Sequence, residues 1–138
     1  MTAVTRRTVL AAGAVGAGTL ALAACGSSSS TSQSSSAAPP ANAQLAKLDD
    51  IEVGQSVAAK LPDGRSAIVS RPTSDTAVAF SARCTHMGCT VAPAGSELHC
   101  PCHGSKYNAL TGAVIQGPAS QPLAKLAIRV ANGEVVTS

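Results

Sequence analysis

Large aromatic side chains are almost absent from this chain, which has one Phe, one Tyr and no Trp among 138 residues. Charged residues make up only 12% of it, and the formal net charge of +3 includes Arg6 and Arg7 near the start. Without these two arginines the chain carries eight Lys and Arg against seven Asp and Glu. A nearly neutral chain with no basic stripe, and no aromatic residues between basic ones, argues against nucleic-acid binding.

Helical periodicity is also missing after the first 44 residues. Short β-branched or alternating runs lie between turn signals instead, which is typical of antiparallel strands. Such runs cover residues 56–61, 65–70, 76–81, 90–91, 97–99, 125–131 and 134–137. The turn signals Pro62-Asp63-Gly64 and Asn132-Gly133 predict a hairpin each. We therefore expect an all-β fold, a small antiparallel sandwich or barrel.

Residues 1–24 have the pattern of a signal peptide rather than of a domain element. A basic start with Arg6 and Arg7 is followed by an apolar stretch, residues 9–24, which three glycines interrupt, so it would make a poor stable membrane span. The segment around the two arginines resembles a twin-arginine signal, the export route for proteins that are already folded. A Sec signal that happens to contain two arginines is the alternative.

Cys25 follows Leu22-Ala23-Ala24, and this sequence resembles a bacterial lipobox, in which the cysteine is lipidated and becomes the N-terminus. Ordinary cleavage at an Ala-x-Ala site, which would leave a free thiol, is the alternative. Residues 25–44 are rich in Ser and Ala, which predicts a disordered tether, and residues 45–138 are expected to form one domain. These features predict a protein exported and anchored to the outer face of the bacterial cytoplasmic membrane, where disulfides persist.

Two short boxes in the predicted domain combine cysteine with histidine. They are Cys84-Thr85-His86-Met87-Gly88-Cys89 and Cys100-Pro101-Cys102-His103-Gly104-Ser105. Each box offers one Cys and one His as ligands and has one further cysteine. Two thiolates and two imidazoles suit a [2Fe–2S] cluster, and they also suit a structural zinc ion in a non-redox module. Zinc fingers usually pair Cys with Cys and His with His, and would leave the extra cysteines without a role, so the pattern favours the cluster.

Both boxes resemble those of the Rieske family, in particular its disulfide-bearing branch in cytochrome bc complexes. The resemblance covers residues 78–119. It implies the Rieske fold, with two cluster-binding loops at one end. It also implies three residue pairs: Cys84 and Cys100 on one iron, His86 and His103 on the other, and a disulfide between Cys89 and Cys102.

The resemblance also implies residues that surround and tune the cluster. Ser105 would donate a hydrogen bond to a bridging sulfide and Tyr107 to a cysteine sulfur, and each bond would raise the reduction potential. A turn-capping serine and a core aromatic are the alternatives for these two residues. Gly117-Pro118 resembles the proline loop that covers the cluster, although a simple turn has the same sequence. Met87 is expected on the exposed tip.

The function that the resemblance implies is one-electron transfer, as in the iron–sulfur subunit of quinol–cytochrome c oxidoreductase. The expected partners are the membrane, a redox partner protein and, as in that family, a quinol. The chain lacks the transmembrane helix and the longer insertion of typical bc subunits. This difference keeps open a stand-alone carrier or a small subunit of another exported oxidase, similar to arsenite oxidase. We expect no catalytic site beyond the cluster, so whether the chain is itself an enzyme is left open.

Overall fold

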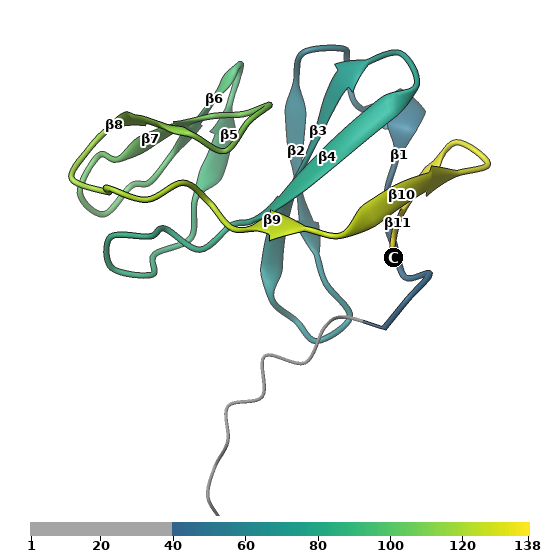
Figure 1. Ribbon diagram of the computed structural model, residues 1–138, viewed down its shortest axis with the longest axis horizontal. Helices are drawn as coiled ribbons and strands as arrows, with labels where there is room; N and C mark the ends of the chain where they lie inside the picture. The colour runs from purple at the N-terminus through teal and green to yellow at the C-terminus, as the bar shows by residue number, and fades with distance from the viewer. Residues whose placement is uncertain (1–39) are drawn as a thin grey trace, which may run out of the picture. The chain divides into compact units, whose positions relative to one another are not determined.

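The computed structural model describes residues 40–138, which form strands and one short 3-10 turn (Figure 1). The expected signal peptide, Cys25 and most of the expected tether lie in residues 1–39, outside the described residues. No helix within residues 40–138 is long and apolar enough to cross a bilayer. The elements are β1 (Gln44–Lys47), η1 (Leu48–Asp50), β2 (Ser56–Lys60), β3 (Ser66–Thr73), β4 (Thr76–Ser81), β5 (Ala92–Ala94), β6 (Glu97–His99), β7 (Lys106–Asn108), β8 (Val114–Gln116), β9 (Lys125–Leu126), β10 (Ile128–Ala131) and β11 (Glu134–Thr137).

The strands form three antiparallel sheets, in the orders β1-β11-β10, β2-β3-β4-β9 and β5-β6-β7-β8. Figure 1 shows the β5–β8 sheet at one end, the β1-β11-β10 sheet at the other, and the remaining sheet between them. The prediction of an all-β antiparallel fold is confirmed.

Both predicted hairpins are present. β2 and β3 pair in register from Ser56↔Ser70 to Lys60↔Ser66, around the turn that contains Gly64. β10 and β11 pair up to Ala131↔Glu134. The two residues between them, Asn132 and Gly133, have φ angles of 52° and 76°, as a tight two-residue hairpin turn requires.

The predicted single strand over residues 125–131 is wrong. Its first part, β9, pairs with β4 through Ala79↔Leu126, whereas β10 pairs with β11 in another sheet. Ala127 lies at the break, and its carbonyl accepts a hydrogen bond from the N–H of Ser138 at 3.2 Å. Residues 125–131 thus contribute strands to two different sheets, because the chain passes from one sheet to the other at Ala127. Strands β1, β5, β7 and β8 have no match among the predicted runs.

The central sheet has a buried core on each of its faces. Ile68 and its cross-strand partner Phe80 belong to one core, while the adjacent pair Val69 and Ala79 belongs to the other. The first core continues into the β5–β8 sheet and includes Leu98, Tyr107, Ala109, Cys84 and Cys100. The second lies toward the β1-β11-β10 sheet and includes Leu48, Ile51 and Val135. The cysteines that begin the two boxes are therefore part of the hydrophobic core.

Gly112 fixes the loop between β7 and β8 against this core. Its φ of 72° lies in the left-handed region, and a Cβ atom here would lie 2.8 Å from the ring of Phe80. Its carbonyl accepts the N–H of Leu123 at 2.9 Å. Only glycine allows this close approach, which anchors the chain just after the segment 117–121 that contacts the boxes.

Candidate metal centre

The two boxes fold into loops with the same backbone hydrogen bonds. In the first, the N–H of Cys84 donates to the carbonyl of Cys89, and the N–H of Gly88 donates to the carbonyl of Cys84, both at 2.8 Å. The corresponding bonds in the second box measure 2.8 Å and 3.1 Å. Gly88 and Gly104 occupy the same place in their loops, with φ of 79° and 77°. Each loop thus turns back on its own first cysteine, and glycine makes the turn possible.

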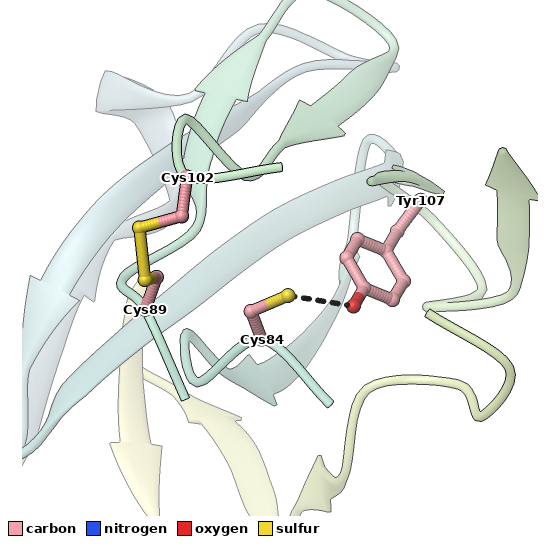
Figure 2. The surroundings of a disulfide bond; sticks show 4 residues. All are labelled: Cys84, Cys89, Cys102 and Tyr107. Atoms are coloured by element: carbon pink, nitrogen blue, oxygen red, sulfur yellow. Dashed lines mark hydrogen bonds between the residues drawn. A yellow bond between two sulfur atoms is a disulfide. The ribbon is translucent and has the colours of Figure 1, made fainter. Parts of the chain in front are cut away.

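A disulfide between Cys89 and Cys102 ties the two loops together (Figure 2), with a Cα–Cα distance of 6.5 Å. These are the two cysteines that the resemblance implied. The sulfur of Cys100 is close by, since the Sγ atoms of all three residues lie within 4.8 Å of one another. Two of these sulfurs are consumed in the disulfide, so this trio is not a metal site.

The four expected ligands form two close pairs, one of thiols and one of imidazoles, and each pair takes one residue from each loop. Cys84 and Cys100 are free thiols and are buried, with 3% and 2% of their surface exposed. His86 and His103 are exposed, and their rings meet edge to face with centroids 4.8 Å apart. The site therefore has two sulfur donors on the core side and two nitrogen donors on the solvent side.

The surroundings of the two thiols favour ionisation at Cys84. Burial opposes it, but hydrogen bonds from the Tyr107 hydroxyl, the backbone N–H of His86 and the Cys100 thiol lower the pKa of Cys84 to about 7. Burial, reinforced by the neighbouring Cys84, raises the pKa of Cys100. Because thiolate is the form that binds metal, hydrogen-bond donors directed at a buried sulfur prepare it for ligation.

Tyr107 is fully buried, and its hydroxyl lies 3.3 Å from Sγ of Cys84 (Figure 2). The N–H of Thr85 donates to the Tyr107 oxygen at 3.2 Å, and the Thr85 hydroxyl donates to the carbonyl of Gln121 at 2.7 Å. The hydroxyl hydrogen of Tyr107 is then left with two acceptors, Oγ1 of Thr85 at 3.1 Å and the sulfur. A thiolate is the stronger, charge-assisted acceptor. Burial also raises the pKa of Tyr107, so the phenol keeps its proton.

Thr85 and Gln121 were not expected from the sequence. Their contact joins the first box to a segment 36 residues away. The only sequence signal was the position of Thr85 between two expected ligands, where its backbone is necessarily close to the site.

Ser105 is fully buried, and its oxygen accepts the N–H of Ala119 at 3.0 Å. Within residues 40–138 its hydroxyl hydrogen has no protein acceptor. Ala119 directly follows Gly117 and Pro118, which are joined by a cis peptide bond and are exposed. The bond to Ser105 therefore holds this segment against the second box. A buried donor without an acceptor costs free energy, so the free hydrogen of Ser105 indicates a non-protein acceptor in the site.

Met87 is the most exposed large apolar residue of the region, with 68% of its surface accessible. It lies between His86 and Gly88, and Pro101 and Pro118 are exposed as well. The solvent side of the site thus includes three exposed apolar residues.

Comparisons with known proteins agree on one family. Residues 42–127 match the Rieske [2Fe–2S] domain family. The cytochrome b6-f complex iron–sulfur subunit of Chlorobaculum thiosulfatiphilum is 38% identical over 112 residues, which cover 72% of this chain and 59% of that subunit. The subunit of that name in Chlorobaculum tepidum is 36% identical over 91 residues, covering 64% and 49%. The chain thus spans about half to three-fifths of the length of these curated relatives.

A solved structure extends the likeness to the fold. The plasma membrane Rieske protein PetC3 from Synechocystis PCC 6803 superposes with a TM-score of 0.60 at 25% identity, over 70% of this chain and 98% of that one.

The donor set of the site fits a [2Fe–2S] cluster. Two thiols and two imidazoles would supply two protein ligands for each of two irons. The hydroxyl hydrogen of Ser105 would suit a bridging sulfide as acceptor, and the hydroxyl of Tyr107 is directed at the sulfur of Cys84. A zinc ion would satisfy the same four ligands but would leave Ser105 without an acceptor.

Proposed function

Because this chain belongs to the Rieske [2Fe–2S] domain family, whose cofactor is a [2Fe–2S] cluster, we propose that it is a one-electron carrier. In this proposal Cys84 and Cys100 bind one iron, and His86 and His103 bind the other. The observation that carries it is that two loops joined by a disulfide bring two buried thiols beside each other and two exposed imidazole rings into contact. When bound, the cluster takes up and releases one electron, at a raised potential because neutral imidazoles replace two thiolates.

The chain positions the two sides of this site for different tasks. Burial of Cys84 and Cys100 in the core keeps water from the sulfur side. The exposed rings of His86 and His103 bring the other side to the surface, where a partner can approach closely. The hydroxyls of Tyr107 and Ser105 supply hydrogen-bond donors to the negative charge that reduction adds. Each donor stabilises the reduced form and so raises the midpoint potential.

Tyr107→Phe and Ser105→Ala are therefore each expected to lower the midpoint potential while the cluster stays bound. The loss of one hydrogen bond of about 1 kcal/mol corresponds to about 40 mV for a one-electron couple. Protein-film voltammetry of the wild type should show a reversible one-electron wave, and each variant should show the same wave at lower potential.

Ser70→Ala provides the matched control, since it removes an equally buried hydroxyl whose hydrogen goes to the carbonyl of Ala109. Its potential should equal that of the wild type. An unchanged potential in both site variants would contradict the assigned donors. Absence of any reversible one-electron wave in the iron-loaded wild type would contradict electron transfer itself.

We also propose that the protein is exported and held by a lipid on Cys25 at the outer face of the bacterial cytoplasmic membrane. The lipobox-like sequence before Cys25 and the twin-arginine-like start support this location, as does a disulfide of the kind that persists in oxidising compartments. The likeness to cytochrome b6-f subunits and to a plasma membrane protein supports it further. Its partners would be a redox protein and a quinol that hydrogen-bonds to His86 or His103.

Cys25→Ser is expected to release the protein from the membrane fraction or to block its processing, because the lipid can be attached only to the thiol. Cell fractionation, with mass spectrometry of the mature N-terminus, measures both effects. Replacing Arg6 and Arg7 by lysine should instead stop export of the folded, iron-loaded protein. A Cys25→Ser protein that matures normally and stays in the membrane would show that no lipid anchor exists.

A further inference from the structure

Within residues 40–138, Arg83 lies against the first box and forms no ion pair with a carboxylate. Arg83 directly precedes Cys84 and is exposed. Its side chain folds over the loop, so that a Cβ atom at Gly88 would lie 3.1 Å from its Nε. Together with His86 and Met87 it lines a surface hollow of about 610 Å³. The guanidinium therefore lies over the Gly88 turn and lines the same hollow as His86.

Positively charged side chains outnumber carboxylates at this end of the domain. Glu97 is the one carboxylate between residues 76 and 133, and it is engaged by His99 at 2.8 Å and by Lys106 at 3.8 Å. No ion pair within residues 40–138 involves Arg83. The other six carboxylates belong to segments outside the two boxes and the β5–β8 sheet: Asp49, Asp50, Glu52, Asp63, Asp75 and Glu134.

The cluster itself does not cancel this charge. Two thiolates and two bridging sulfides balance two ferric ions, so the oxidised group adds no net charge, and the reduced group adds one negative charge. Arg83 is thus a positive charge without an ion-pair partner among residues 40–138, and it lines the same hollow as the His86 imidazole. Beside it lies Met87, and exposed Met and Arg are residues that protein interfaces favour over ordinary surface.

We propose that Arg83 and Met87 form a charge-selective docking surface for a redox partner protein whose matching face carries carboxylates. This inference rests on the proposed electron-transfer function and adds the chemistry of the partner. Met87 supplies the apolar contact near the imidazoles, and Arg83 attracts and orients the acidic face. A charge at the rim of an interface acts mainly on the association rate, and its effect weakens as salt screens it.

The test uses the iron-loaded full chain, reduced and then mixed with oxidants of opposite charge. The probes are ferricyanide, an anion, and tris(phenanthroline)cobalt(III), a cation. Arg83→Glu should lower the ratio of the two second-order rate constants, anion over cation, roughly tenfold or more at low ionic strength. The change should shrink steadily as salt is added. A shift in the midpoint potential would change both rate constants in the same direction, so it affects their ratio little.

Two further variants separate local charge from other causes. Arg83→Lys keeps the charge and should keep the wild-type ratio. Arg129→Glu makes the same change of net charge on β10, in the sheet at the opposite end of the domain, and should leave the ratio nearly unchanged (Figure 1). The acidic copper protein plastocyanin and the basic haem protein cytochrome c then replace the inorganic probes. Arg83→Glu should slow oxidation by plastocyanin and speed oxidation by cytochrome c.

Equal ratios in Arg83→Glu and Arg129→Glu would overturn the docking proposal, and so would a plastocyanin rate that does not change. Either result would leave the proposed function intact as long as both probes oxidise the wild type by one electron. Failure of both probes to oxidise an iron-loaded wild type would instead overturn the proposed function.

Discussion

Alanine at any one of Cys84, His86, Cys100 or His103 is expected to abolish binding of the [2Fe–2S] cluster. In the proposed site each iron would have two protein ligands, and the removal of either would leave an open position that water and oxidants attack. Purified wild type should contain two irons per chain and show a Rieske-type electron paramagnetic resonance signal after reduction. The four variants should be colourless and free of iron, which metal analysis and visible absorption measure directly.

His99→Ala is the matched control for these variants. His99 is the histidine of this chain that is not an expected ligand. It adjoins Cys100, but its ring nitrogen Nε2 is hydrogen-bonded to the carboxylate oxygen Oε2 of Glu97 at 2.8 Å. It belongs to β6 rather than to either loop, so this variant should keep both irons. Stoichiometric zinc in the wild type, or two irons retained after loss of one of the four ligands, would contradict the proposed site.

The two loops that hold the expected ligands could be predicted from the sequence because each box is a local structure. The spacing from Cys84 to Gly88 is enough to specify a loop that bonds back to its first residue, and the second box repeats it. The hairpin turn at Asn132-Gly133 was predictable for the same reason, since two residues with positive φ define it. Features set by neighbours in the chain were therefore predictable in detail.

Features set by distant partners were not predictable. β1 forms because Gln44 pairs with Val136, some ninety residues later, and no pattern within four residues reveals such a partner. The break at Ala127 likewise depends on which sheet each half of the run joins. In the site, Thr85 was missed because its role comes from Gln121 in another segment. Long-range pairing decides these positions, and local propensity does not.

Removal of the disulfide, by Cys89→Ala together with Cys102→Ala, is expected to destabilise the domain by about 3 kcal/mol. The two cysteines are separated by 13 positions. A cross-link that closes a loop of about 15 residues restricts the unfolded chain by roughly this free energy. In a domain of this length such a loss lowers the melting temperature by roughly 12 to 24 °C. The core has only two aromatic side chains, Phe80 and Tyr107, so little other packing is available to compensate.

The effect should be concentrated in the two boxes, because this bond joins them directly, in addition to the cluster that both boxes would bind. Thermal melting followed by visible absorption should show cluster loss at lower temperature than in the wild type. Wild type treated with a reductant strong enough to open the disulfide should reproduce the variant's melting curve. Cys25→Ser, which removes a cysteine outside the boxes, should melt like the wild type. A double variant that retains the wild-type melting temperature would show that the cluster, the hydrogen bonds within each loop and the shared core are sufficient to hold the two boxes in place.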